Sequence, residues 1–445
     1  MRKTLYFYRN QSQITMTVNR VLISFLLTAF IVNSCSNQKE SHISSVTVKI
    51  TDEKGIELPF YSLQVIDIKD CWLGTPRTSK EGGKEKPITI QFRKDEPAIL
   101  KFGAPGYQPK FTFLPPGSGS FDLEVTLRSP VLLDDPNPVI VGDFNDFDPR
   151  KGIQMAKQPE GIWTAEIESD RDTIHYIVNQ YAMSSLSGTD GEYTLRVDAR
   201  GLDTPVMNRM TKSADDPKFI VHFKPSEYTF YVTDSDLKFS QDVSDELTGI
   251  ATIYTRMIDE YVDFIFSRAL FQMRGEEGSY DHDFSPYLAD LKTIQNNYQN
   301  PAVSNAAALA KFRFSREIDL SESEAVSLLN SLSPDSPLWM MHYTALTDAV
   351  NLVGLDESID MLSEIAKKSP YEELRAEALY NIVRYHYKKE NEEEWHASFF
   401  ELVSNYPEHF RTSYAYKNFA PEQPVAEGKA LPYHQFNALE DEEGI

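Results

Sequence analysis

The chain has 445 residues, of which 41% are hydrophobic and 12% aromatic, a composition typical of globular domains and not of disordered chains. Its formal net charge at pH 7 is −23, from 67 acidic and 44 basic side chains. A surface this negative repels phosphate backbones, so the composition argues against nucleic acid as a partner.

Residues 1–34 have the form of a secretory signal peptide. They contain no acidic residue and four basic ones, and they end in an uncharged apolar run at 21–32. Such a run is too short to span a bilayer as a mature helix. Removal of residues 1–34 leaves 40 basic and 67 acidic side chains, a net charge of −27.

Cys35 follows the apolar run directly after Asn33 and Ser34. The stretch resembles the lipobox of bacterial lipoproteins, in which a cysteine receives a diacylglycerol and becomes the new N-terminus. The resemblance implies lipidation of Cys35, a membrane partner through that anchor, and a polar tether over 35–45. Ser36, not aspartate, follows the cysteine, which by lipoprotein sorting implies a place in the cell envelope, on the outer membrane facing the periplasm. Ordinary secretion with an incidental cysteine is the alternative.

Only one cysteine, Cys71, follows Cys35, so the mature chain has no partner for an intramolecular disulfide. Cys71 lies beside Trp72 in an apolar run, and we interpret it as a buried small hydrophobe rather than a reactive thiol.

Residues 46–130 have the pattern of short β-strands. Val46, Val48 and Ile50 alternate with polar residues, the period of a half-buried strand. Further strands are predicted at 62–68, 88–92, 99–102, 110–114 and 121–127. This spacing predicts an antiparallel sandwich. The segment resembles transthyretin-type, carboxypeptidase-regulatory-like modules on the strength of Val48, Asp52, Gly55, Gly106 and Tyr107. The resemblance implies a spacer or adhesion-like module without catalytic residues.

Residues 137–235 predict a second antiparallel sandwich, with strands 219–223 and 228–233 completing it or joining it to the next segment of the chain. The segment resembles the glycogen-binding module found beside amylase catalytic domains and in the β subunit of AMP-activated kinase. The matching residues are Gly142, Asp143, Phe144, Asn145, Met155, Gly161, Trp163 and Tyr176.

That family binds sugars by stacking aromatic rings on pyranose faces. Phe147 occupies the place of one sugar-facing tryptophan, and Tyr181 is the one residue that can replace the second. Phe147 and Tyr181 are therefore the possible glycan-binding residues. Because both tryptophans are missing, a degenerate structural module is our preferred interpretation, with Trp163 in the core.

Residues 242–418 change to a helical pattern, with apolar residues at spacings of three and four. Helices are predicted at 247–270, 285–298, 302–313, from 321 onward, and at 338–350, 355–367, 372–387 and 392–406. Asp242 or Ser244 can cap the first, and Ser321 with Glu324 resembles a capping box.

Pro337, Pro370 and Pro407 each precede a helical pattern, at spacings of 33 and 37 residues. The segment resembles a tetratricopeptide array, whose repeat is about 34 residues. This resemblance implies an α-helical repeat domain that holds a protein or peptide on its concave face. Generic packing of helical hairpins without a ligand is the alternative.

Motifs of catalysis are missing from the sequence: it has no phosphate-binding glycine loop, HExxH, GxSxG or CxxC. The one tight cluster of histidine and carboxylates is Asp281-His282-Asp283, which we interpret as a surface loop rather than a metal site. The sequence therefore predicts no catalytic residue, no metal and no cofactor.

Residues 419–445 combine a proline-rich linker with a segment that resembles the opening of thioredoxin-like thiol–disulfide oxidoreductase domains. Gly428, Pro432, Phe436 and Leu439 are the matching residues. The resemblance implies a redox lipoprotein whose CxxC lies beyond residue 445. A disordered acidic tail is the alternative.

The sequence thus predicts a multidomain β-then-α chain: two antiparallel β-sandwiches followed by an α-helical repeat domain. The favoured function is a non-catalytic envelope lipoprotein that binds or positions a partner. The alternatives are the scaffold of a thiol–disulfide oxidoreductase and a glycan-binding lipoprotein.

Overall fold

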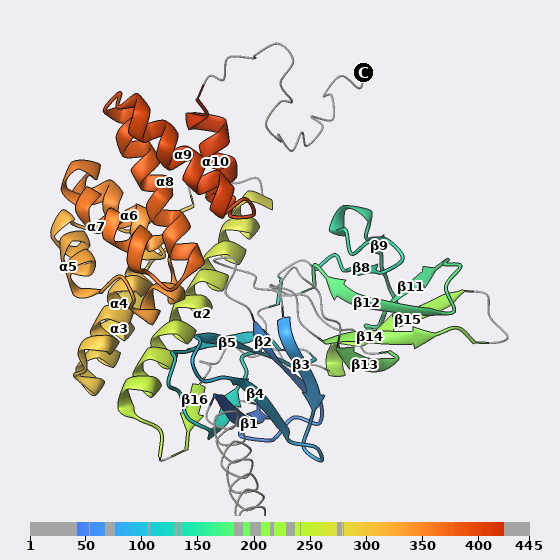
Figure 1. Ribbon diagram of the computed structural model, residues 1–445. Coiled ribbons are helices and arrows are strands. Elements are labelled where there is room, and N and C mark those ends of the chain that lie inside the picture. Colours follow the sequence, from blue (N-terminus) through green and yellow to red (C-terminus); the bar gives the residue numbers. More distant parts are fainter. Residues whose placement is uncertain are drawn as a thin grey trace, which may run out of the picture. The chain divides into compact units, whose positions relative to one another are not determined.

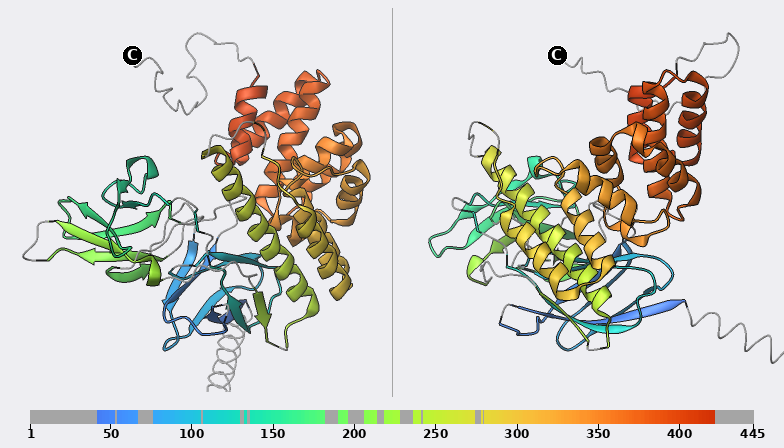
Figure 2. Two further views of the ribbon diagram at one scale, coloured as in Figure 1. Left: turned by 180° about the vertical axis from the view of Figure 1, so that it is seen from behind. Right: turned by 90° about the vertical axis from the view of Figure 1, so that its left-hand side faces the viewer.

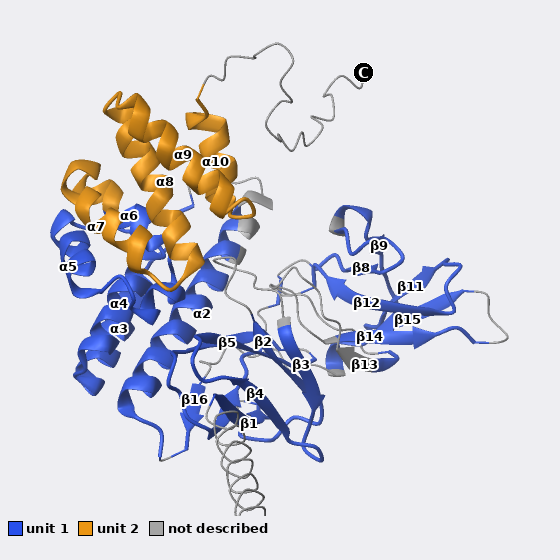
Figure 3. Cartoon of the chain, viewed as in Figure 1, with its two compact units in different colours: residues 1–349 blue, residues 350–445 orange. Residues whose placement is uncertain are grey.

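The computed structural model describes residues 42–421 with short gaps. The gaps are at 53, 67–75, 106, 130–131, 134–135, 182–189, 196–205, 214–217, 228–235, 241, 274–277 and 279. The predicted signal peptide, Cys35, Cys71 and the C-terminal segment 422–445 lie outside the described residues. As predicted, a β-rich region is followed by a helical region (Figure 1). The chain divides into two compact units, residues 1–349 and 350–445 (Figure 3).

The first β region contains two four-stranded sheets that share one hydrophobic core, with strand orders β16-β7-β1-β4 and β3-β2-β5-β6. Its strands are β1 (Ile43–Thr51), β2 (Tyr61–Ile66), β3 (Pro76–Gly82), β4 (Ile88–Arg93), β5 (Ala98–Gly103), β6 (Lys110–Leu114), β7 (Phe121–Thr126) and β16 (Asp236–Phe239). Val46, Val48 and Ile50 are buried in this core, as their alternation predicts. Residues 43–45, expected in the tether, belong to β1.

The sheet that contains β1 is mixed and not purely antiparallel. β1 pairs antiparallel with β4 but parallel with β7. β16 then joins the other side of β7, with Asp236 opposite Thr126. The chain therefore returns to the first β region after the second one. Pairing between strands so far apart in the sequence leaves no local pattern of residues, so this return could not be predicted from the sequence.

The second β region has a five-stranded sheet, β13-β14-β12-β8-β9, and a three-stranded sheet, β10-β11-β15. Its strands are β8 (Val139–Gly142), β9 (Ile153–Gln154), β10 (Ala156–Lys157), β11 (Trp163–Ile167), β12 (Thr173–Asn179), β13 (Glu192–Leu195), β14 (Val206–Thr211) and β15 (Phe219–Phe223). β15 confirms the strand predicted at 219–223, whereas residues 228–233 lie outside the described part. A side chain at Gly142 would place Cβ 2.4 Å from the carbonyl oxygen of His175, which explains the glycine.

The described residues contain nine α-helices. They are α2 (Asp245–Met273), α3 (Ser285–Tyr298), α4 (Pro301–Phe312), α5 (Glu322–Ser331), α6 (Ala345–Val353), α7 (Leu355–Lys368), α8 (Glu372–Lys388), α9 (Glu392–Asn405) and α10 (Phe410–Phe419). Ser244 caps α2 through the amide of Leu247, at 3.2 Å. The capping box of Ser321 and Glu324 is confirmed at α5.

The continuous helix predicted at 338–350 is wrong. Residues Pro337–Met341 form a 3-10 helix, η3, and α6 begins only at Ala345. All four residues 338–341 are buried, whereas an amphipathic helix keeps one face in solvent. Tertiary burial therefore overrides the periodic pattern here.

Helix α2 joins the helical region to the first β region. It packs alongside β6, and in both views of Figure 2 it lies next to the strands of the first β region. Thr255 Oγ1 donates a hydrogen bond of 2.8 Å to the carbonyl oxygen of Phe111, and Thr112 Oγ1 donates one of 3.2 Å to that of Ala251. In the second unit, α8 packs against α7, α9 and α10.

Candidate functional site

Phe147 lies in a small core of the second β region. Its side chain is 7% exposed and belongs to a cluster with Val139, Val141, Ile177 and Met207. The amide of Gly142 donates a hydrogen bond of 2.8 Å to Asn145 Oδ1, which stabilises the turn before Phe147. The Gly-Asp-Phe-Asn turn thus directs this ring inward, and little of its face reaches solvent.

Tyr181 packs against the other core of the same region. Its ring lies edge-on to Phe223, with centroids 4.8 Å apart, and edge-on to Trp163 at 6.4 Å. Burial raises the pKa of its hydroxyl above the usual range. Phe147 and Tyr181 therefore belong to separate clusters, and the structure does not bring the two predicted residues into one site.

Several aromatic side chains of helices α8–α10 in the second unit reach solvent, and we refer to them together as the aromatic surface. We define it by Tyr387, Trp395, Phe400, Tyr416 and Phe419. Tyr387 is 46% exposed, Phe400 42% and Tyr416 39%. The ring of Tyr387 lies 5.1 Å from those of both Trp395 and Phe419. Trp395 Nε1 donates a hydrogen bond of 2.9 Å to the carbonyl oxygen of Phe419, which holds the indole in place.

A buried ion pair stabilises the helices that carry the aromatic surface. Glu377 of α8 is fully buried, and its carboxylate accepts hydrogen bonds of 2.6–3.1 Å from Arg411 of α10. The guanidinium of Arg411 also lies 4.8 Å from the ring centroids of Tyr380 and Phe410. Two helices that are distant in sequence are thereby connected through one charged contact.

His409 makes the stability of the second unit depend on pH. Its Nδ1 accepts a hydrogen bond of 3.2 Å from the amide of Arg411 and so caps α10. Burial, assisted by the charge of Arg411, lowers the pKa of His409 to about 4. An unfolded histidine titrates near about 6.5, so between these values the unfolded state binds more protons and stability falls as the pH falls.

We expect the His409→Asn variant to keep a capping acceptor and to lose this pH dependence. For the wild type, the free energy of unfolding should fall by on the order of 1–2 kcal/mol between about pH 6.5 and 5 from this group. Denaturant unfolding measured across that range checks the prediction. Equal slopes for both proteins would contradict it.

A polar stripe along α2 faces the first β region and α3. Thr252, Thr255, Arg256, Asp259 and Asp263 recur at spacings of three and four, which places them on one side of a helix. The helix was predicted from its apolar residues alone, so its polar stripe was not recognised in the sequence. Its regular spacing was the signal that could have found it.

This stripe forms one wall of a polar cleft with a volume of about 250 Å³. Six charged residues of the described ranges line it: Lys110, Arg128, Arg256, Asp236, Asp259 and Asp290. Arg128 donates hydrogen bonds of 2.7 and 2.9 Å to the two carboxylate oxygens of Asp263. Arg256 Nε donates one of 2.9 Å to Asp290. The cleft is therefore built from both charge types, held by elements far apart in the sequence.

Lys110 is the most buried charged residue of the polar cleft. Its side chain is 2% exposed, and its Nζ lies 3.6 Å from Asp259 Oδ2. Burial lowers the pKa of this amine below its usual range, although the Asp259 carboxylate opposes the shift. A lysine in such a place is costly unless something stabilises its charge.

Asp281, His282 and Asp283 lie in an irregular segment before α3, in which Asp281 and Asp283 are exposed, as predicted for a surface loop, but the side chain of His282 is largely buried. It is 15% exposed, and its Nε2 lies 2.7 Å from Glu260 Oε1. Its Nδ1 lies 3.1 Å from the hydroxyl of Tyr280, and its ring contacts Phe284 with centroids 4.6 Å apart. Among the described residues no group of three histidine, cysteine or acidic side chains is arranged to hold a metal ion.

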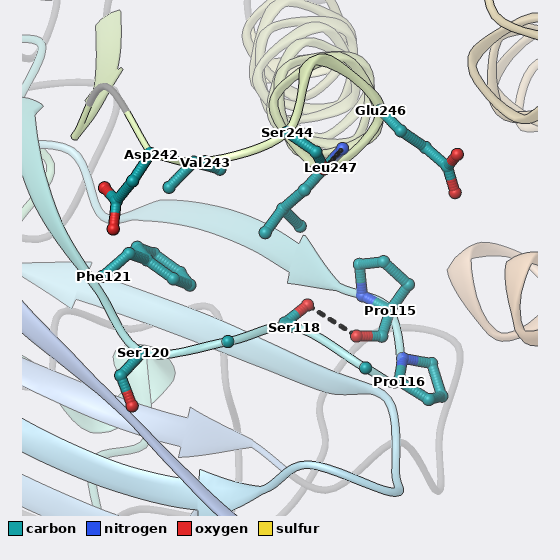
Figure 4. Close-up of a pocket in the computed structure, with 12 residues that line it drawn as sticks. Pro115, Pro116, Ser118, Ser120, Phe121, Asp242, Val243, Ser244, Glu246 and Leu247 are labelled. Carbon is teal, nitrogen blue, oxygen red and sulfur yellow. Dashed lines mark hydrogen bonds between the residues drawn. The ribbon is translucent and has the colours of Figure 1, made fainter.

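A second cavity, of about 240 Å³, lies between the loop after β6 and the start of α2 (Figure 4). Leu247 points toward this loop, where Ser118 Oγ donates a hydrogen bond of 2.6 Å to the carbonyl oxygen of Pro115. Asp242 and Glu246 line the cavity, but no basic side chain of the described part of the chain does. It lacks the paired charges of the polar cleft.

In comparisons with known proteins, no family model matches the chain, and no curated protein matches it. Within the described ranges, no helix is both long and apolar enough to cross a bilayer.

Proposed function

We propose that this chain is a non-catalytic, lipid-anchored envelope protein that binds a protein partner through the aromatic surface of α8–α10. In this proposal both β regions are sandwiches that serve as spacers, and the helices form a tetratricopeptide-like domain. The exposure of Tyr387, Phe400 and Tyr416 on neighbouring helices is the observation that carries the proposal.

Large aromatic side chains favour protein–protein contacts. Tyrosine, tryptophan and phenylalanine are enriched at the centres of interfaces, because they bury much apolar area with few rotatable bonds. Here Tyr387, Trp395 and Phe419 are fixed by mutual contacts and by the Trp395 hydrogen bond, so these three side chains lose little entropy on binding. Three glutamates at 392–394 precede Trp395 and are exposed, which favours a partner with basic residues at the rim.

The anchor at Cys35 fits the start of the first β region. β1 begins at Ile43, eight residues after Cys35. An extended chain of that length reaches about 28 Å. Such a short connection would hold the first β region close to the membrane surface, as a spacer requires.

Site-specific photo-crosslinking in intact cells tests the proposed surface. A photoreactive phenylalanine analogue at position 400 or 416 should give a discrete adduct with one protein. Tyr414 is the matched control: it is 52% exposed on the same helix, but two residues from Tyr416 and hence on the opposite side. The same analogue at position 414 should give no such adduct.

The Tyr387→Ala variant should reduce the adduct at position 416 by about tenfold or more, the loss expected when an interface anchor is truncated. The His409→Asn variant, which keeps a capping acceptor for α10 and changes none of these rings, should leave the adduct unchanged. Equal adducts at 414 and 416, or none at either position, would refute the proposed surface.

A further inference from the structure

We propose that the polar cleft binds a small zwitterionic ligand, an α-amino acid with an apolar side chain. Its carboxylate would contact Lys110 and Arg128, and its ammonium group would contact Asp290. This inference does not depend on the proposed partner surface, because every residue involved belongs to the first unit.

The first argument is that two cations of the cleft, the buried Lys110 and the largely buried Arg128, have buried donor atoms without acceptors. Arg128 uses Nη1 and Nη2 on Asp263, and its buried Nε has no acceptor among the residues that the structure describes. Nor does Lys110 Nζ have one within the described ranges, since Asp259 at 3.6 Å is beyond hydrogen-bond distance. Buried donors are rarely left unpaired, so the site calls for an acceptor oxygen.

The second argument is the balance of charge, which selects the class of ligand. Among the residues that the structure describes, the lining contains three cations and three carboxylates. Because Asp259 already lies beside Lys110, a dianion such as phosphate would be repelled. Asp290 is 54% exposed, whereas Lys110 is 2% exposed, so the negative end of a ligand belongs inside and the positive end at the mouth.

Size and apolar lining narrow the class further. A volume of about 250 Å³ is small even for a metabolite site. Leu237 and Ile294 provide the apolar part of the lining, while the hydroxyls of Thr252, Thr255 and Thr293 donate to backbone carbonyls and keep lone pairs for a ligand. These features fit a single amino acid with a side chain such as that of valine or leucine.

Calorimetric titration of the purified full chain tests the inference. L-valine or L-leucine should give saturable heat. Isobutylamine and isovaleric acid, which lack the carboxylate and the amine respectively, should bind at least about tenfold more weakly. The Asp290→Asn variant should bind the amino acid more weakly than the wild type does, but its affinity for isovaleric acid should be unchanged.

Two lysine variants separate the cleft from general effects of charge. Lys110→Met should lower the affinity by at least about tenfold. Lys101→Met is the matched control, because Lys101 is likewise buried, at 3% exposed, but does not line the cleft. The Lys101→Met variant should bind the amino acid as tightly as the wild type does. Cooperative thermal unfolding verifies that both variants fold. If Lys110→Met does not fold, Ile294→Trp, which fills the cleft, should abolish binding instead.

Three results would overturn the inference. The first is no saturable heat with any standard amino acid up to about 10 mM, well above a millimolar Kd. The second is equal binding by the Lys110→Met and Lys101→Met variants. The third is isovaleric acid binding as tightly as valine, which would make the cleft a simple anion site.

Discussion

Replacing Glu377 by alanine is expected to destabilise the helices α7–α10 by about 3–5 kcal/mol, because it leaves the Arg411 charge buried without its partner. Glu377 is fully buried and Arg411 only 15% exposed, so water cannot replace the lost carboxylate without disturbing the packing. Denaturant unfolding of the purified chain, followed by helical circular dichroism, measures the loss.

Two further variants separate the buried pair from general effects of removing an acid. Glu364→Ala is the matched control: Glu364 pairs with Lys368 on the surface of α7, where the side chains are 47% and 66% exposed. Its loss should cost less than about 1 kcal/mol. The double variant Glu377→Leu/Arg411→Met should recover most of the stability, because it removes both buried charges. A change below about 1 kcal/mol for Glu377→Ala would contradict the assigned role of the pair.

Replacing Cys35 by alanine is expected to abolish labelling of the protein by a fatty-acid analogue. In the proposed anchor the lipid is attached through the thiol of Cys35, and each buried CH₂ group contributes about 0.8 kcal/mol to membrane binding, so several chains anchor a protein firmly. The labelled wild type should stay in the membrane fraction in high salt and be released by detergent, because salt weakens electrostatic but not hydrophobic attachment.

Cys71→Ala is the matched control for this experiment, since Cys71 is the one other cysteine of the chain. That variant should take up label as the wild type does. Absence of label from the wild type would refute the lipoprotein proposal. That result would not bear on the binding proposals for the aromatic surface and the polar cleft, because both are argued from contacts within the described residues 42–421.

Much of the local structure could be predicted from the sequence. Alternation in β1 and the capping box at Ser321 depend on neighbouring residues, and both are confirmed. Strand β3 was missed because its sequence, Pro-Arg-Thr-Ser-Lys-Glu-Gly, lacks an apolar face. Charged residues suit a strand at a sheet edge, and β3 pairs with β2 alone in its sheet.

The sites were harder to predict than the fold. The polar cleft joins Lys110 of β6 to Asp259 of α2 and Asp290 of α3, so no contiguous motif exists to be found. Phe147 matched a sugar-binding position by sequence, but in the structure the side chains of its cluster bury the ring. A single sequence does not show which side chains surround a residue. The glycan-binding and redox-scaffold hypotheses rest on resemblance alone, the latter on residues 419–445.

The pairing of β16 with β7 makes the second β region a guest within a host domain. Strand β7 ends at Thr126 and β16 begins at Asp236, and these two residues face each other across neighbouring strands. Paired residues in an antiparallel ladder lie only about 4.5–5.5 Å apart, so a tight turn can bridge the same gap. Exchange of the guest, or its reduction to a hairpin loop, would therefore keep every strand pair of the host, and the two can evolve separately.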